Sequence, residues 1–124
     1  LIFQNLEPKN NVIWEDFSST IQQTYNENRQ SYFIDATADW CVTCKVNEKH
    51  IESEEVLSKF KEKHVKLIKA DWTLKNPETT ALLNKYGRNG VPLYILYNGQ
   101  TNETILLPQL LTKSTILNKL TNFN

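Results

Sequence analysis

The sequence predicts an α/β fold in which a mixed β-sheet carries helices on both faces. Short apolar segments alternate with segments whose apolar residues recur every three or four positions, a pattern typical of strands joined by helices. Asn98-Gly99, between the last two strand-like segments, indicates a hairpin that adds an antiparallel edge. The 124 residues suffice for one domain, which we expect to span 12–124 after a linker or edge strand at 1–11.

A helix and a buried strand are expected in the first part of the chain. The helix begins at Asn11, as its N-cap, and ends near Asn28, because apolar side chains recur along one face: Ile13, Phe17, Ile21 and Tyr25, with Trp14 alongside. Ser31–Ala36 is rich in aromatic and branched residues, which predicts a strand covered on both faces. Asp35 is the charged exception within this strand.

The middle of the chain predicts helical structure followed by a strand. One helix begins near Cys41 and runs to about His50. Ser53 and the two acids after it indicate another helix start, so the region forms either two short helices or one kinked helix with Val56, Leu57 and Phe60 on its apolar side. Val65–Asp71 alternates apolar and basic residues, which predicts a strand.

The last part of the chain predicts a helix, a hairpin and a final helix. Asn76-Pro77-Glu78 supplies an N-cap, a first helical residue and a first-turn acid, and Gly87 ends that helix. Pro92–Asn98 and Glu103–Leu107 form the hairpin strands, and Thr112 caps a helix with the apolar residues Ile116, Leu117, Leu120 and Phe123. Strands separated by helices are expected to be parallel neighbours.

Composition excludes several classes of function. The 14 basic and 14 acidic residues cancel, so nothing favours binding to nucleic acid or to an anionic membrane surface. The longest apolar run, Leu93–Tyr97, is far shorter than a bilayer span, so we expect no membrane insertion by this segment. Because the chain starts at Leu1 and contains no Met, we expect it to be part of a longer protein.

The two cysteines lie where the predicted buried strand is followed by a helix, with Cys41 at the helix start and Cys44 one turn along. Unpaired N–H groups and the helix dipole stabilise a thiolate at that position, which lowers the pKa of Cys41 and favours its attack on a disulfide. Cys44 can then attack the mixed disulfide and leave a Cys41–Cys44 disulfide. The pattern predicts thiol–disulfide exchange, with Cys41 as the nucleophile and Cys44 as the resolving thiol.

Two other interpretations of the cysteine pair are weaker. A zinc site needs two more ligands, and the spacings of the two histidines, His50 and His64, match no common zinc motif. A purely structural disulfide would close a very short loop and would remove little entropy from the unfolded chain. We therefore expect redox chemistry, with no metal and no bound cofactor.

Several motifs around the cysteines resemble the thioredoxin superfamily. They are Asp35 six residues before Cys41, Asp39-Trp40-Cys41, Lys45, and Gly90-Val91-Pro92 before a strand. Val42-Thr43 stands between the cysteines where common thioredoxins carry Gly-Pro. With Glu48, Asp71-Trp72-Thr73 and Leu107–Thr112, the chain is similar to the C-terminal periplasmic domain of DsbD-type thiol:disulfide interchange proteins, including the ScsB group.

This resemblance implies a thioredoxin fold and a protein-disulfide reductase. Its electrons would come from a transmembrane domain and pass to an N-terminal periplasmic domain of the same protein or to other periplasmic thiol proteins, including those of cytochrome c-type biogenesis. The implied location is the periplasmic side of the bacterial inner membrane, and we expect a monomeric domain. A disulfide oxidant or isomerase of the same fold, and a non-catalytic metal-binding module, are the alternatives.

Two acids are candidates for tuning the cysteine pair. Asp35 is either a carboxylate turned to water at a strand end or a buried proton acceptor near Cys44. Glu48 follows Cys44 by four residues and Cys41 by seven, which places all three on one helix face, and the alternative is a solvated helix acid. The resemblance implies that both acids border the cysteines.

Pro92 and its neighbours are candidates for substrate binding. By spacing alone, Pro92 is a strand-entry proline that lacks an N–H group to donate. The resemblance implies a cis Val91-Pro92 bond packed against the cysteines, with the Val91 backbone pairing with an extended substrate segment. Trp40 either packs in the core or at its rim, or lines the docking surface beside Cys41.

Overall fold

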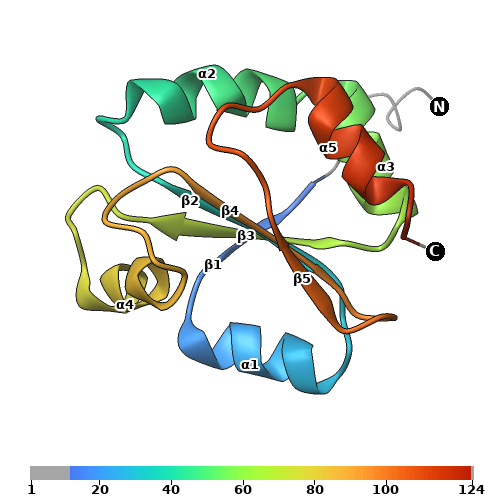
Figure 1. Ribbon diagram of the computed structural model, residues 1–124, viewed down its shortest axis with the longest axis horizontal. Helices are drawn as coiled ribbons and strands as arrows, with labels where there is room; N and C mark the ends of the chain where they lie inside the picture. The colour runs from blue at the N-terminus through green and yellow to red at the C-terminus, as the bar shows by residue number, and fades with distance from the viewer. Residues whose placement is uncertain (1–11, 124) are drawn as a thin grey trace, which may run out of the picture.

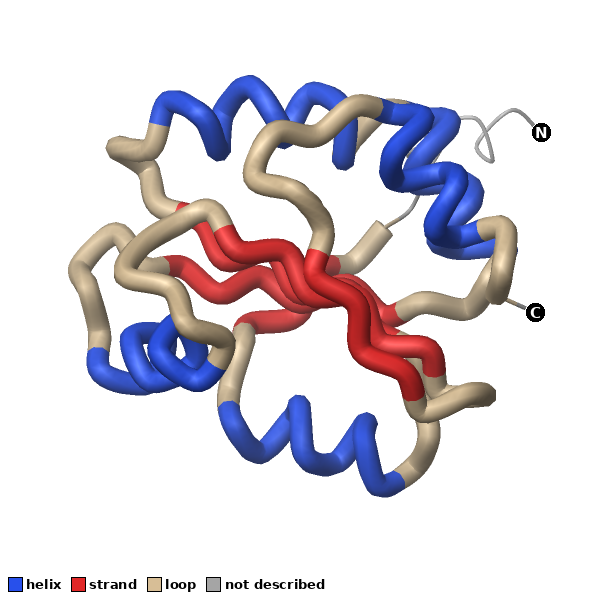
Figure 2. Tube along the Cα trace, in the orientation of Figure 1, coloured by secondary structure: helices blue, strands red, loops and turns tan. Residues whose placement is uncertain are grey.

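The computed structural model describes residues 12–123, so the expected linker or edge strand at 1–11 lies outside the described residues. The elements of these described residues follow one another in this order (Figures 1 and 2): β1 (Trp14–Asp16), α1 (Ser19–Glu27), β2 (Tyr32–Thr37), α2 (Val42–Ile51), α3 (Glu54–Glu62), β3 (Lys66–Asp71), α4 (Pro77–Lys85), β4 (Leu93–Asn98), β5 (Glu103–Leu106) and α5 (Lys113–Leu120).

The five strands form one mixed sheet in the order β1-β3-β2-β4-β5. β1 and β2 run parallel to β3, as expected for strands joined by helices. β4 runs antiparallel to β2 although a helix precedes it, so the expectation of parallel neighbours is wrong for this strand. The reason is that β3 ends and β4 begins at the same edge of the sheet: Trp72 N–H donates to the Thr37 carbonyl at 2.7 Å, and Leu93 pairs with Ala36.

Helices cover both faces of the sheet, as the sequence predicted. In Figure 1, α2, α3 and α5 lie on one side of the strands, and α1 and α4 lie on the other. Successive residues of β2 contribute to opposite cores, because side chains alternate along a strand. Phe33 packs with Phe60 and Tyr94 beneath α2, α3 and α5, whereas Tyr32 and Ile34 belong to the core on the side of α1 and α4.

The predicted first helix is too long at its N-terminal end. Trp14–Asp16 is an extended edge strand, in which Trp14 pairs with Leu67 of β3. The helix begins after Ser18, whose side chain accepts a hydrogen bond from the Ile21 N–H at 3.0 Å, so Ser18 and not Asn11 is the N-cap. Trp14 packs on the core beneath α2, α3 and α5, whereas Phe17, Ile21 and Tyr25 pack on the opposite core, a division that the apolar periodicity alone does not reveal.

The remaining boundaries agree closely with the sequence. The region after Cys41 forms two separate helices, because Ser53 caps α3 and accepts a hydrogen bond from the Val56 N–H. The hairpin between β4 and β5 turns through 99–102, and the positive φ falls on Asn102 and not on Gly99. Gly99 is required for another reason, since a Cβ there would overlap the Arg29 carbonyl.

Candidate redox site

The cysteines lie at the carboxyl end of β2, where the chain enters α2. Cys41 is the N-cap of α2 and its sulfur accepts a hydrogen bond from the Cys44 N–H at 3.2 Å. The two residues form a disulfide, with Cα atoms 5.2 Å apart. Cys44 is fully buried and Cys41 is 7% exposed, so Cys41 is the sulfur that a partner reaches more easily. This is the placement that the sequence predicted for a nucleophile and a resolving thiol.

Asp35 is buried in the middle of the sheet, so its interpretation as a water-facing carboxylate is wrong. Neither of its side-chain oxygens has a hydrogen-bond partner among residues 12–123. Burial raises the pKa of Asp35 to about 7, while the charge of Lys69 acts to lower it and the charges of Glu48 and Glu52 act to raise it. The carboxyl group therefore exchanges a proton near neutral pH, in the range where a thiol can exchange one with it.

Glu48 is half-buried on α2, and its carboxylate accepts a hydrogen bond from the Thr37 hydroxyl at 3.3 Å. This bond ties α2 to the carboxyl end of β2, two residues beyond Asp35. Glu48 is also one of the charges that act on Asp35. The structure thus places Glu48 and Cys44, both on α2, on the side of the sheet that Asp35 faces.

The Val91-Pro92 peptide bond is cis, which confirms the expectation for this bond. Pro92 is buried at the start of β4. Val91 packs against Ala38 and both cysteines, so the segment before β4 borders the disulfide. No contact in the structure tests the expected pairing between the Val91 backbone and a substrate.

Trp40, the residue before Cys41, is half exposed, and its ring is contacted by residues of the loop between β3 and α4. Its indole N–H donates to the Thr73 carbonyl at 3.0 Å, and its ring meets that of Trp72 with centroids 5.8 Å apart. The Lys75 ammonium lies 5.5 Å from both ring centroids, within cation–π range. The sequence did not single out Lys75, whose position became apparent only from the loop between β3 and α4.

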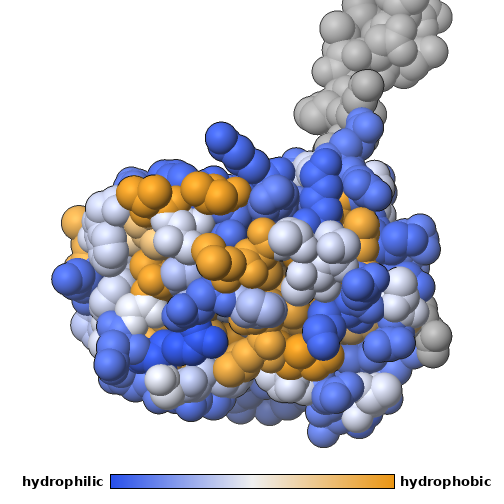
Figure 3. Space-filling view, turned by 45° about the horizontal axis from the view of Figure 1, so that its top comes forward, coloured by the Kyte–Doolittle hydropathy of each residue, from blue (hydrophilic) through white to orange (hydrophobic). Residues whose placement is uncertain are grey.

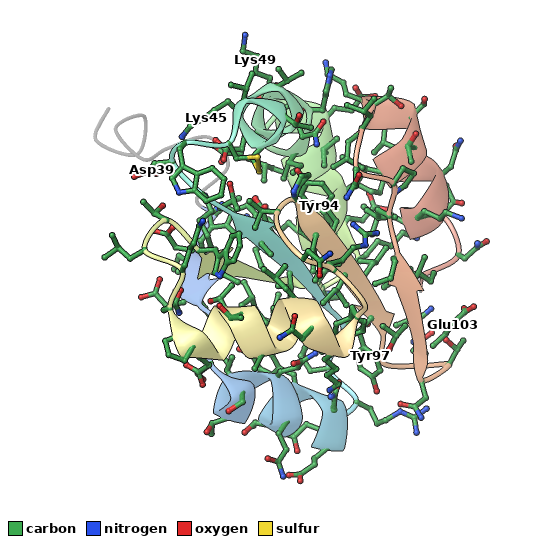
Figure 4. All side chains as sticks on the ribbon, turned by 60° about the vertical axis from the view of Figure 1, so that its left-hand side comes forward. Asp39, Lys45, Lys49, Tyr94, Tyr97 and Glu103 are labelled. Atoms are coloured by element: carbon green, nitrogen blue, oxygen red, sulfur yellow. A yellow bond between two sulfur atoms is a disulfide. The ribbon has the colours of Figure 1, made fainter. Side chains whose placement is uncertain are left out.

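Most of the exposed large apolar side chains in the described part of the chain lie on α2 and on the loops that border it: Trp40, Val42, Val46, Leu74 and Leu110. Ile13, before β1, and Leu106, on β5, are exposed elsewhere. Orange apolar surface is visible in Figure 3 on the side of the molecule where α2 lies, interrupted by polar residues. Figure 4 shows the labelled Lys45 and Lys49 projecting from the outer side of α2. Such a mixed surface suits transient contact with a partner protein.

Asn47 is a buried residue of this site that the sequence reasoning missed. Its amide nitrogen donates to the Tyr94 hydroxyl at 2.9 Å and to the Gln109 carbonyl at 2.6 Å, and its amide oxygen accepts from the Leu111 N–H at 3.0 Å. These bonds fix the segment between β5 and α5 against α2, three residues after Cys44. The polar residue on the buried side of α2 was the available signal.

No group of three or more His, Cys, Asp or Glu side chains in 12–123 is arranged to hold a metal ion. Within the same residues, every helix is too short or too polar to cross a bilayer.

A family profile described as Thioredoxin-like matches residues 13–99. The thiol:disulfide interchange protein DsbD of Haemophilus influenzae (strain PittGG) is 31% identical over 100 residues, which cover 77% of this chain and 17% of that protein. DsbD of Yersinia pestis (strain Pestoides F) is 36% identical over 70 residues, or 56% of this chain and 12% of that protein. The chain thus matches a small part of the length of these relatives.

Solved structures share the fold. The C-terminal domain of Neisseria meningitidis DsbD in the oxidised form has a TM-score of 0.68 at 18% identity, covering 90% of this chain and 100% of that one. The reduced form has a TM-score of 0.66 at 18% identity, with coverages of 88% and 99%. A mutant thioredoxin from Halobacterium salinarum has a TM-score of 0.64 at 19% identity and covers 94% of each chain. These likenesses establish the thioredoxin fold expected from the sequence.

Proposed function

Because the chain belongs to the thioredoxin-like family, we propose that it is a protein-disulfide reductase domain of the DsbD type, which relays two electrons through Cys41 and Cys44. The fold and the Cys41–Cys44 disulfide support thiol–disulfide oxidoreductase chemistry. The observation that carries the proposal is the position of this disulfide at the N-terminus of α2, with Cys41 slightly exposed and Cys44 fully buried.

The reaction consists of two exchanges between sulfur atoms. The Cys41 thiolate of the reduced domain attacks a partner disulfide, forms a bond to one partner sulfur and releases the other as a thiolate. Cys44 then loses its proton and attacks the Cys41 sulfur, which breaks the mixed disulfide and releases the second partner sulfur. The partner gains two electrons, and the domain is left with the Cys41–Cys44 disulfide seen in the structure.

Asp35 is proposed as the acceptor of the proton that Cys44 loses. A carboxyl group with a pKa of about 7 is half ionised at neutral pH, so it can take up a proton and return it without a large free-energy cost. Its position on the side of the sheet beneath α2 supports this role. Glu48 is proposed to tune both groups through its charge, because it lies one helical turn after Cys44.

The docking surface is proposed to include Trp40, Val91 and Pro92. Val91 packs on the cysteines while remaining partly exposed, so its backbone is available to pair with an extended segment that carries the partner disulfide. Trp40 is held in place by Thr73 and Trp72 and so offers a fixed apolar wall next to Cys41.

The similarity to DsbD proteins also supports a proposal for the partners and the location of the domain. The matched region forms 17% of the length of the Haemophilus thiol:disulfide interchange protein, which fits one domain of a larger protein. We propose a transmembrane electron donor and an N-terminal periplasmic domain of that protein, or other periplasmic thiol proteins, as partners. The domain would then be located on the periplasmic side of the bacterial inner membrane.

The reduction potential separates a reductase from an oxidant of the same fold. We expect equilibration of the domain with a glutathione redox buffer to give a potential below about −200 mV, in the range of thioredoxin-like reductants. A value near about −120 mV would identify an oxidant instead. In a separate assay with a disulfide-bonded protein as substrate, the wild type should show turnover and the Cys41→Ala variant should show none.

A further inference from the structure

Tyr94 is a buried phenol that the exchange reaction does not use. It is fully buried on β4 and is the direct antiparallel partner of Asp35 on β2. Side chains of such partners leave the same face of the sheet, with Cβ atoms about 5 Å apart. Figure 4 shows Tyr94 between the sheet and α2. The Tyr94 ring therefore extends alongside the Asp35 carboxyl group toward the helix that carries the cysteines.

Asn47 determines how the Tyr94 hydroxyl is used. The phenolic oxygen accepts the Asn47 amide N–H at 2.9 Å, so the hydroxyl hydrogen is left free to turn to a second group. Within 12–123 no hydrogen bond has this hydroxyl as its donor, and the Asp35 oxygens have no donor either. Burial raises the pKa of Tyr94 well above its usual range, so the hydroxyl keeps its hydrogen at neutral pH.

We propose that Tyr94 is a positioning residue of the redox site, whose hydroxyl, oriented by Asn47, stabilises the ionised form of Asp35. A hydroxyl hydrogen rotates to follow a nearby charge, so its dipole favours the carboxylate over the neutral acid. The functional meaning of this role rests on the proposed function, in which Asp35 takes the proton of Cys44. Tyr94 would thereby set how readily that proton is held and returned.

The other charged groups that act on Asp35 come from two elements, β3 and α2, the latter including its C-cap residue Glu52. Lys69 lies beside it on β3, while Glu48 and Glu52 act on it from α2, which also carries the cysteine pair at its start. Lys69 favours the carboxylate and the two glutamates oppose it. These charges are unchanged when the Tyr94 hydroxyl is removed, so a shift in the Asp35 titration in that variant reports on the hydroxyl.

The test is a titration of Asp35 in the oxidised domain, followed by carbon NMR of its carboxyl group. Tyr94→Phe should raise the midpoint by about half a pH unit or more, roughly a threefold change in proton affinity. Tyr97→Phe is the matched control, because Tyr97 is buried on the same strand and loses one hydrogen bond, to Asn102, but faces the opposite core. The control should leave the midpoint unchanged.

A measurement on the unmodified domain covers the case in which Tyr94→Phe does not fold. The Cζ resonance of Tyr94 should shift with pH at the Asp35 midpoint, whereas the Tyr97 resonance should not. A flat Tyr94 resonance, or an unchanged Asp35 midpoint in folded Tyr94→Phe, would overturn the proposal. These NMR measurements do not depend on thiol–disulfide exchange. A negative result would therefore contradict the role of Tyr94 without contradicting the proposed function, which is tested separately by the turnover of Cys41→Ala.

Discussion

Among the described residues, the carboxyl oxygens of Asp35 are the buried side-chain polar atoms without a hydrogen-bond partner, and burial raises the pKa of this group. A carboxyl group in an apolar sheet interior retains its proton to higher pH, because ionisation there lacks the stabilisation that water provides. The raised pKa that makes Asp35 a suitable proton acceptor should therefore also make the free energy of unfolding depend on pH.

Replacing Asp35 by Asn should remove a pH dependence of stability. The pKa is raised from 3.8 to about 7, so between these values the folded protein retains a proton that the unfolded chain has released. Stability of the oxidised wild type should therefore fall as pH rises from about 4 to 7 and then level off, by at most roughly 4 kcal/mol.

Urea unfolding measures this directly. Asp35→Asn should be more stable than the wild type at pH 8 and similar to it at pH 4, because Asn resembles the protonated acid in shape and charge. If the two proteins keep a constant difference in unfolding free energy across this pH range, Asp35 does not titrate as the structure indicates.

The charge of Glu48 should raise the pKa of the Cys41 thiol and so disfavour the thiolate. The helix dipole favours the Cys41 thiolate by about 0.3 to 2 kcal/mol, whereas two like charges about 6 Å apart at a dielectric near 20 repel by roughly 2.8 kcal/mol. Glu48→Gln should therefore lower the apparent thiol pKa by up to about two pH units, as measured by the pH dependence of alkylation. Glu62→Gln on α3, an exposed acid paired with Lys59, should leave it unchanged. A raised thiol pKa in Glu48→Gln would contradict this role.

The two cysteines could be predicted from the sequence because their pattern involves only neighbouring residues. The residues that pack around them could not, because they come from distant parts of the chain. The spacing of Cys41 and Cys44 and the helix start after a buried strand follow from neighbouring residues. Whether Asp35 faced water or the interior depended on which strands flank β2, and the structure resolves this in favour of burial. Asn47 was missed because its three hydrogen bonds join residues that are 47 to 64 positions apart in the chain.

At the scale of the elements, the error in the first helix has a clear cause. Trp14 pairs with β3 and Ser18 caps α1, so one apolar periodicity was shared between a strand and a helix. The later helices were predicted closely because their first residues carry clear start signals, such as Pro77 at the first position of α4. Ser53 and Thr112 both accept a hydrogen bond from an N–H group of the first turn.

The contact between the hairpin and the end of α1 depends on a glycine. Gly99 accepts a hydrogen bond from the Arg29 side chain at 2.7 Å, and its backbone lies so close to the Arg29 carbonyl that no Cβ fits. Gly99→Ala should therefore destabilise the fold by about 1 to 3 kcal/mol, since backbone must move.

The matched control for Gly99 is Gly90→Ala. A Cβ at Gly90 would lie 3.6 Å from the Trp72 ring, an ordinary contact, so this variant should be within about 1 kcal/mol of the wild type. Denaturant unfolding of both variants checks the comparison, and equal stabilities would show that the Gly99 contact relaxes without cost.

At the scale of the whole molecule, the strand order brings three connections to one end of the sheet. The carboxyl end of β2 leads to Cys41, the end of β3 leads to Trp72 and Thr73, and β4 begins after Val91 at the same edge. The sequence predicted the sheet class and the residues in these connections. The reversed direction of β4 could not be predicted from periodicity, because parallel and antiparallel strands share the same alternation.

The most direct test of the account counts the electrons that leave the cysteine pair. Mixed with excess DTNB, the fully reduced domain should release two thionitrobenzoate ions per chain and form the Cys41–Cys44 disulfide, seen by mass spectrometry. Cys44→Ala should release one ion and retain the other group on Cys41, while Cys41→Ala should react much more slowly because Cys44 is buried. Equal reaction rates for the two single variants, or two retained groups on the wild type, would contradict a relay that starts at Cys41 and is resolved by Cys44.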